Sequence, residues 1–194
     1  MKKNMAGLKL YIDPEHRLSL TLLPCGAVEH GDLQDLARAL DGKGMRVTIA
    51  KSVPVPLEAF QPRRQQYRAD DFLNAARNEP GDRVLVVTDC DLYAGDFNFA
   101  LGLAEAPGKR AVISLFRLRT GADKETFRRR AVKEAVHELG HTFGLSHCAN
   151  PGCVMRFSNS LADTDRKGSQ WCESCEQELQ ASRGNIPHLQ QDGG

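Results

Sequence analysis

The sequence predicts an α/β fold, in which short buried strands alternate with helices around one mixed sheet. Between residues 18 and 116, apolar segments of five or six residues recur, as is typical of buried strands. Stretches with apolar residues at three- and four-residue steps separate them, as is typical of helices. This alternation indicates a sheet covered by helices. The chain has 194 residues and no spacer or low-complexity stretch, so we expect one domain over 1–194.

The first predicted unit is a β-α-β segment. Residues 18–23 and 45–50 read as strands because apolar side chains recur in each. A helix lies between them and ends at Gly42. Its apolar face consists of Leu33, Leu36, Ala37 and Leu40.

The middle of the chain continues the alternation. Residues 69–78 read as a second helix, and the continuous Val and Leu run of 83–88 suits a buried parallel strand. Residues 112–116 give another strand. Between these two strands, residues 97–104 are expected to form a short edge strand. A peptide substrate can add to such an edge by main-chain hydrogen bonds; an edge strand without a ligand is the equally weighted alternative.

A long amphipathic helix is expected to begin at Asp123, a good N-cap residue. Its apolar stripe consists of Phe127, Ala131, Val132, Ala135, Val136, Leu139 and Phe143. The basic run 128–130 is interpreted as a solvated helix face, since the net charge is only +1 and no aromatic residues interleave the run. This composition argues against nucleic-acid binding.

Residues 137–147 carry the strongest functional signal, three histidines and a glutamate at fixed spacing. His137 and His141 are four residues apart, so on a helix they can present two imidazole nitrogens to one Zn²⁺. Gly144 can take a positive φ and turn the chain, which brings His147 to the same metal. Three imidazoles leave a coordination position open for water, and Glu138 is the natural general base. The alternative is a helix on which the histidines and the glutamate are ordinary surface residues that bind no metal. The other three histidines, His16, His30 and His188, are interpreted as ordinary polar residues.

Four cysteines follow the third histidine within 28 residues: Cys148, Cys153, Cys172 and Cys175. Their spacing suits a closed tetrahedral zinc site that stabilises the fold, although the first pair is wider than usual. Two disulfides are the rival interpretation; the absence of a secretion signal favours the metal. Met155 is expected to pack beneath the catalytic metal, which ordinary core packing of a methionine would also describe. The sequence therefore predicts two Zn²⁺ per chain, one catalytic and one structural.

The run from His137 to Cys148, with Cys153, Met155, Cys172 and Cys175, resembles the signature of the archaemetzincins, a family of the metzincin clan. Residues 88–93 and 97–105 resemble family segments as well. Sixteen residues separate Met155 from Cys172, one fewer than in the family pattern, so that loop is expected to differ. The resemblance implies a metzincin-like fold, a catalytic zinc on His137, His141 and His147 with Glu138 as base, and a four-cysteine zinc site. The order of the predicted elements separately indicates an N-terminal part over about 1–147 and a zinc-clamped C-terminal part over 148–194, whose helix covers about 172–182.

Two cysteines lie outside these sites. Cys25 is preceded by Leu23 and Pro24, whereas the inhibitory cysteine of metzincin pro-segments follows an arginine, so inhibition is not expected. Cys90 lies between Asp89 and Asp91 at a predicted strand end, where a turn cap explains both acids. No role is assigned to these residues.

The N-terminus lacks the apolar core of a signal peptide, and no segment is long enough to span a membrane. We therefore expect a cytoplasmic protein without membrane or nucleic-acid partners. We expect a monomer, although the sequence leaves the oligomeric state open, and we expect the last ten residues to be loose.

Two functions remain in competition. The first is a zinc metallopeptidase acting on a peptide or protein substrate, with aminopeptidase or short-peptide specificity. The alternative is a non-catalytic, zinc-stabilised module that binds peptides or proteins. Glu138 favours the peptidase, because a binding module has no evident need of a carboxylate there. A zinc-ribbon nucleic-acid binder is a third interpretation that the near-neutral charge disfavours.

Overall fold

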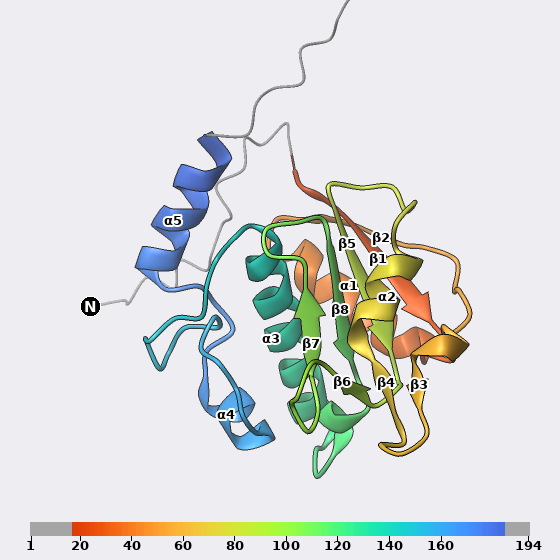
Figure 1. Ribbon diagram of the computed structural model, residues 1–194. Helices are drawn as coiled ribbons and strands as arrows, with labels where there is room; N and C mark the ends of the chain where they lie inside the picture. Colours follow the sequence, from red (N-terminus) through yellow and green to blue (C-terminus); the bar gives the residue numbers. More distant parts are fainter. Residues whose placement is uncertain (1–16, 185–194) are drawn as a thin grey trace, which may run out of the picture.

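A twisted five-stranded sheet forms the centre of the protein (Figure 1), seen in a computed structural model that describes residues 17–184. The strand order is β2-β1-β5-β8-β7, and all neighbours are parallel except the edge pair β7 and β8. The strands are β1 (Ser19–Cys25), β2 (Arg46–Ile49), β5 (Arg83–Thr88), β7 (Gly102–Ala104) and β8 (Arg110–Ser114). The predicted α/β fold and its β-α-β opening are confirmed. The predicted edge strand shrinks to the three residues of β7.

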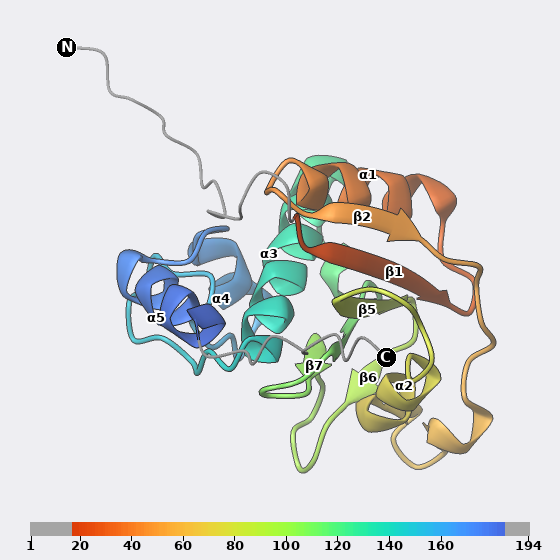
Figure 2. The same cartoon turned by 90° about the horizontal axis from the view of Figure 1, so that it is seen from above.

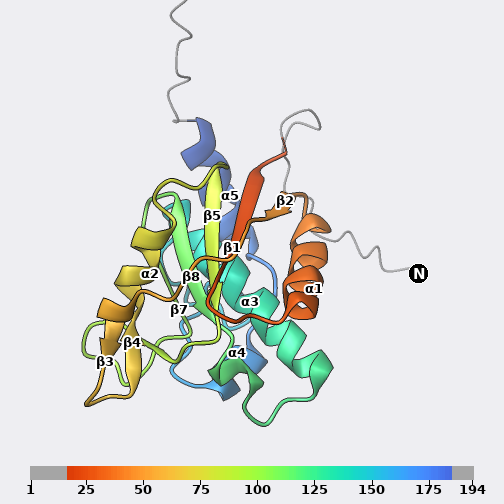
Figure 3. The same cartoon turned by 90° about the vertical axis from the view of Figure 1, so that its right-hand side faces the viewer.

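Helices cover both faces of this sheet. The helices α1 (His30–Asp41) and α3 (Lys124–Thr142) lie on one face, and α2 (Ala69–Ala75) lies on the other (Figures 2 and 3). The strand residues alternate between the two layers, since Leu22 and Leu85 join the core under α1 and α3, whereas Leu23 and Val86 join the core under α2. This burial on both sides explains the continuous apolar runs of the central strands.

A second, three-stranded sheet with the order β3-β4-β6 lies beside the first. Its strands are β3 (Phe60–Gln61), β4 (Gln66–Arg68) and β6 (Leu92–Tyr93), and single 3₁₀ turns occur at η1 (Leu57–Ala59) and η2 (Arg117–Arg119). The sequence did not predict this sheet, because strands of two or three residues carry too little periodicity to be recognised.

The C-terminal part lies beyond α3, away from the central sheet (Figures 1 and 2). It contains α4 (Leu161–Arg166), which was not predicted, and α5 (Glu173–Gly184), which confirms the predicted helix with a small shift of its ends. Its division from the rest at residue 147 stays a prediction. The last ten residues, His16 and His188 lie outside the described residues. None of the helices within residues 17–184 is both long and apolar enough to cross a membrane.

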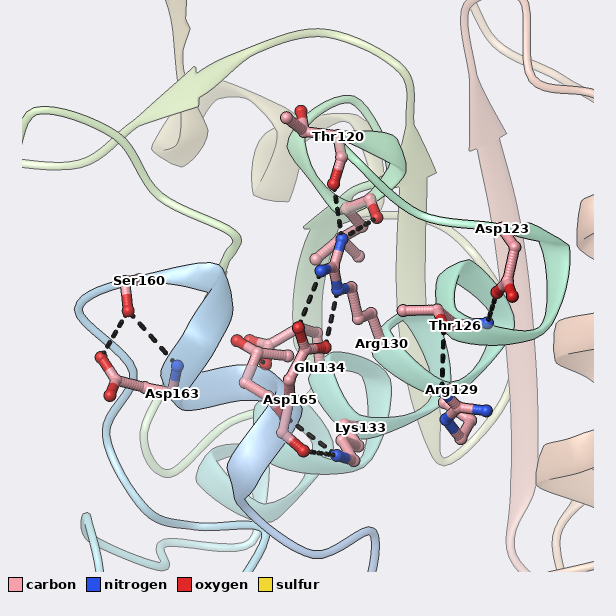
Figure 4. A network of polar contacts seen from close by, with 12 residues as sticks. Thr120, Asp123, Thr126, Arg129, Arg130, Lys133, Glu134, Ser160, Asp163 and Asp165 are labelled. Carbon is pink, nitrogen blue, oxygen red and sulfur yellow. Dashed lines mark hydrogen bonds and ion pairs between the residues drawn. The ribbon is translucent and has the colours of Figure 1, made fainter.

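The helix α3 departs from the amphipathic helix that the sequence predicted. It begins after the predicted N-cap Asp123, whose carboxylate accepts a hydrogen bond from the Thr126 N–H. Polar side chains on the side away from the sheet are nevertheless buried against α4 (Figure 4). Arg130 is only 6% exposed and donates two hydrogen bonds of 2.8 Å to the carboxylate of Asp165. The interpretation of 128–130 as a solvated face is therefore wrong for Arg130, whose partner lies 35 residues further along the chain.

Candidate active site and metal centres

The C-terminal half of α3 positions two of the predicted metal ligands. The Nδ1 atom of His137 hydrogen-bonds the Val154 carbonyl at 2.8 Å, and that of His141 hydrogen-bonds the Leu145 carbonyl at 2.7 Å. A carbonyl can only accept, so each Nδ1 carries the proton and each Nε2 keeps its lone pair free. The two Nε2 atoms are 3.2 Å apart, close to the roughly 3.3 Å expected between two nitrogens on one tetrahedral Zn²⁺.

The third ligand reaches the site through the predicted turn. Gly144 has φ +93°, a conformation that other residues rarely adopt, and the chain reverses there. The ligand atoms of His137, His141 and His147 all lie within 4.8 Å of one another. Burial lowers the pKa of all three imidazoles, so they are neutral and able to bind metal at neutral pH. The donor set therefore fits zinc.

Glu138 lies on the same turn of α3 and is only 5% exposed. Burial, and next the Glu134 carboxylate, raise the pKa of Glu138 well above its usual value. Its carboxylate packs directly against the backbone of Gly102 in β7, where an added Cβ would overlap it. Glu138 and the three histidines line one cleft of about 400 Å³, whose opposite wall is β7 and the loop before it.

Sequence reasoning missed a buried ion pair beside this cleft. Lys167 Nζ lies 2.9 Å from Glu134 Oε1, and the two side chains are 1% and 4% exposed. Glu134 also accepts a hydrogen bond from the Thr164 hydroxyl at 3.3 Å. Glu134 precedes Glu138 by one helical turn, a spacing that places both carboxylates on one face of the helix. This spacing could have identified Glu134 as a residue of the site. Lys167 left no such local signal.

The four cysteines meet on the other side of the third histidine. The Sγ atoms of Cys148 and Cys172 are 3.7 Å apart, as are those of Cys153 and Cys175. Two sulfurs on one tetrahedral Zn²⁺ are expected about 3.8 Å apart, whereas a disulfide bond measures about 2.05 Å. The structure contains neither rival disulfide, since all four cysteines are free. A hydrogen bond with the Ser174 hydroxyl is the main reason why the pKa of Cys172 falls to about 6, which favours the thiolate that zinc requires.

Met155 joins the two centres. It is completely buried, and its sulfur packs against α3 at Gly140, where an added methyl group would overlap it. The Met155 carbonyl accepts the backbone N–H of Cys148 at 3.0 Å. The neighbouring residue Val154 accepts from His137 and donates its N–H to the Gln170 carbonyl at 2.8 Å. One short segment therefore contacts both ligand sets.

The residues to which the sequence assigned no role lie elsewhere. Cys25 is the buried last residue of β1, and burial raises the pKa of its thiol to about 12. Asp91 pairs with Arg117 at 2.6 Å, and Asp89 pairs with Arg119 at 3.2 Å. These contacts explain both acids structurally. His30 is exposed and hydrogen-bonds Gln34, as expected of an ordinary polar histidine.

A second hollow, of about 480 Å³, lies between α1 and the first half of α3. It contains none of the zinc-motif residues. The converged ligand atoms therefore identify the smaller cleft as the chemical site.

Comparison with known proteins places the chain in a family. A model of Peptidase family M54 matches residues 53–181, which is 129 of the 194 residues. The chain belongs to this family. As an M54 member it is a zinc metallopeptidase, and the resemblance to archaemetzincins is confirmed. The archaemetzincin of Natronomonas pharaonis is 40% identical over 164 residues, which cover 77% of this chain and 95% of the relative. That of Archaeoglobus fulgidus is 47% identical over 129 residues, which cover 66% and 78%.

Solved structures of M54 relatives share the fold. The crystal structure of the archaemetzincin from Methanopyrus kandleri superposes with a TM-score of 0.79 at 36% identity, over 87% of this chain and 96% of that chain. The Archaeoglobus fulgidus enzyme, complexed with malonate, gives a TM-score of 0.76 at 41% identity, over 83% and 99%. The expected metzincin-like α/β fold is therefore confirmed.

Proposed function

We propose that this M54 peptidase hydrolyses peptide bonds in the 400 Å³ cleft, with Glu138 as the general base. One observation carries the proposal: a buried carboxylate lies one residue from a ligand in a set of three converged imidazoles, and all four side chains line the same cleft. His137, His141 and His147 would hold the metal. A zinc ion bound there would supply a Lewis acid that makes water more acidic and polarises the substrate carbonyl.

Glu138 performs the proton transfers in this proposal. Its carboxylate accepts a proton from the attacking water and then donates it to the leaving amine. Burial raises the pKa of Glu138, which makes its carboxylate a stronger proton acceptor than an exposed glutamate. Contact with Gly102 holds the carboxylate in place.

We also propose a second zinc on the four cysteines, which gives two per chain. The sulfur separations and the free thiols support it. The closed donor set leaves no open coordination position, so this zinc would stabilise the C-terminal part and not take part in the reaction.

The free side of β7 is proposed to bind the substrate backbone. Leu101 accepts from the Ser114 N–H and Glu105 donates to the Arg110 carbonyl, so alternate residues of this segment face β8. Gly102 and Ala104 must then direct their N–H and C=O groups away from β8. Both residues line the cleft, where an extended peptide can pair with them.

Replacing Ala104 by proline tests the substrate contact. The change removes one outward N–H on an edge strand and spares the hydrogen bonds to β8. We expect a raised KM for peptides with unchanged zinc content and an unchanged unfolding temperature. Peptide kinetics equal to those of the parent protein would count against backbone pairing at β7.

The cleft favours short-peptide specificity over aminopeptidase specificity. A site for a substrate amino terminus needs a free carboxylate. Glu134 is the only described carboxylate besides Glu138 that lines the cleft, and Lys167 already pairs with it. We therefore expect peptides with blocked amino termini to be cleaved.

Glu138→Gln tests the proposed function itself. We expect intact zinc content and a loss of turnover of roughly 10² or more, because the variant cannot accept a proton. Glu125→Gln is the matched control, since Glu125 lies on the same helix but is exposed. Equal turnover in the Glu138→Gln variant would remove Glu138 from the mechanism. A parent protein that binds peptides without any turnover would support the alternative of a binding module.

A further inference from the structure

Two exposed aromatic rings face each other at the cleft. Phe97 is 60% exposed and Phe157 is 40% exposed, and both line the cleft. Their ring centroids are 6.2 Å apart and their planes are tilted by 52°. Exposed rings of this size are unfavourable in water, since each leaves a large apolar surface hydrated. Their position inside a cleft suggests that a ligand covers them.

The pair lies next to the metal-binding side chains. The Phe157 ring centroid is 4.8 Å from that of His147, and Phe157 follows Met155 by two residues. Phe97 comes from the opposite wall, in the loop between β6 and β7. A side chain of the substrate residue beside the scissile bond would therefore lie within reach of both rings.

Phe97 lies in a loop whose backbone is held in place by hydrogen bonds. The Phe97 N–H donates to the Ala94 carbonyl at 3.2 Å, and its carbonyl accepts from the Arg64 guanidinium. The next residue is held as well, because Gln66 Nε2 donates to the Asn98 carbonyl at 2.9 Å. These contacts fix the main chain and leave the ring free to contact a ligand.

The charged groups of the cleft disfavour a charged substrate side chain. Besides the histidines, Glu134 and Glu138 are the only charged groups among the described residues that line it. Lys167 neutralises Glu134, and Glu138 serves the reaction in the proposed function. A charged substrate side chain between the two rings would lose its hydration without gaining an ion-pair partner.

We infer that Phe97 and Phe157 form a subsite for a large apolar side chain, best an aromatic one, on the substrate residue next to the scissile bond. This inference rests on the proposed peptidase function. A third ring can pack against two tilted rings in the geometry that aromatic groups prefer. The two phenylalanines thereby determine specificity and take no part in the bond cleavage.

Phe97→Ala is the decisive variant, because Phe157 contacts a metal ligand and Phe97 does not. The substrates are blocked peptides of one length, with Phe, Leu, Ala, Lys or Asp on either side of one scissile bond. We expect kcat/KM of the parent for the Phe peptide to exceed that for the Ala, Lys and Asp peptides. Phe97→Ala should lower the value for the Phe peptide by roughly 10-fold and that for the Ala peptide by less than twofold. Phe116→Ala, which removes a 53% exposed ring outside the cleft, should change neither.

Binding of the same peptides to the Glu138→Gln variant separates the subsite from catalysis. Tighter binding of the Phe peptide, lost on adding Phe97→Ala, would establish the subsite even if the parent cleaves nothing. Equal affinity for the Phe and Ala peptides would overturn the inference. A rise in kcat/KM for every peptide in Phe97→Ala would overturn it too, since the ring would then obstruct the cleft.

Discussion

Gly102→Ala is expected to inactivate the enzyme by moving Glu138. A Cβ built on Gly102 lies 2.5 Å from Glu138 Oε1 and 2.6 Å from its Cγ. Comfortable contacts between such atoms are about 3.5 Å, so one of the two groups must move by about 1 Å. The glycine belongs to a strand paired with β8, whereas the carboxylate ends a side chain, so the carboxylate moves.

A displacement of this size is large for a catalytic group. A misplacement of 1 Å is enough to reduce a rate by about 10²-fold, because proton transfer needs hydrogen-bond distance. We expect a loss of turnover of that order with an unchanged zinc content. The crowding itself costs about 1–3 kcal/mol of stability, as is usual when a methyl group is forced into a packed region.

The assay is the single-turnover rate on a short blocked peptide, with zinc measured on the same sample. Gly31→Ala is the matched control, since a Cβ there has no neighbour within 4 Å and Gly31 lies in the first turn of α1. It should leave turnover unchanged. Parental turnover in Gly102→Ala would refute the reasoning, because it would show that the contact between β7 and Glu138 does not position the base.

Two further predictions concern the structural contacts behind the site. Lys167→Met should destabilise the protein by about 3–5 kcal/mol, roughly 10 °C in unfolding temperature, because it leaves Glu134 buried without its cation. Replacing both Lys167 and Glu134 by Met should restore most of this loss, and a double variant no better than the single one would argue against the ion pair. Cys172→Ser should lower zinc by more than one equivalent or destabilise the domain. Loss of one equivalent with full activity would show that the two metal sites are independent.

The sequence predicts those parts of the fold that depend on local periodicity. The strand at 83–88 has the predicted bounds, because every residue after Arg83 is buried and apolar or small. The edge strand was predicted at 97–104 but begins only at Gly102, since the preceding loop is held by Arg64 and Gln66 from another part of the chain. A partner more than 30 residues away leaves no periodic signal.

The same distinction between local spacing and contacts from distant parts of the chain holds for the active site. Spacing along one helix and one turn determines how His137, His141 and His147 converge, and Gly144 has the positive φ that this turn requires. By contrast, the pairing of Glu134 with Lys167 depends on how the C-terminal part packs against α3. Exposure of an aromatic ring in a cleft is likewise a property of the folded surface, because a sequence does not distinguish a buried phenylalanine from an exposed one.

The contacts between α3 and the C-terminal part also bear on the order in which the active site is completed during synthesis. A nascent chain that ends before Val154 already contains the three histidines and Glu138, but it lacks Val154 and Lys167. His137 then has no carbonyl to orient its ring, and the buried Glu134 has no cation. Such a chain contains the zinc-binding motif, but the side chains of the motif lack the contacts that hold them in the geometry of the folded site. Completion of the peptidase site therefore has to wait until the segment around Val154 and Lys167 has been synthesised.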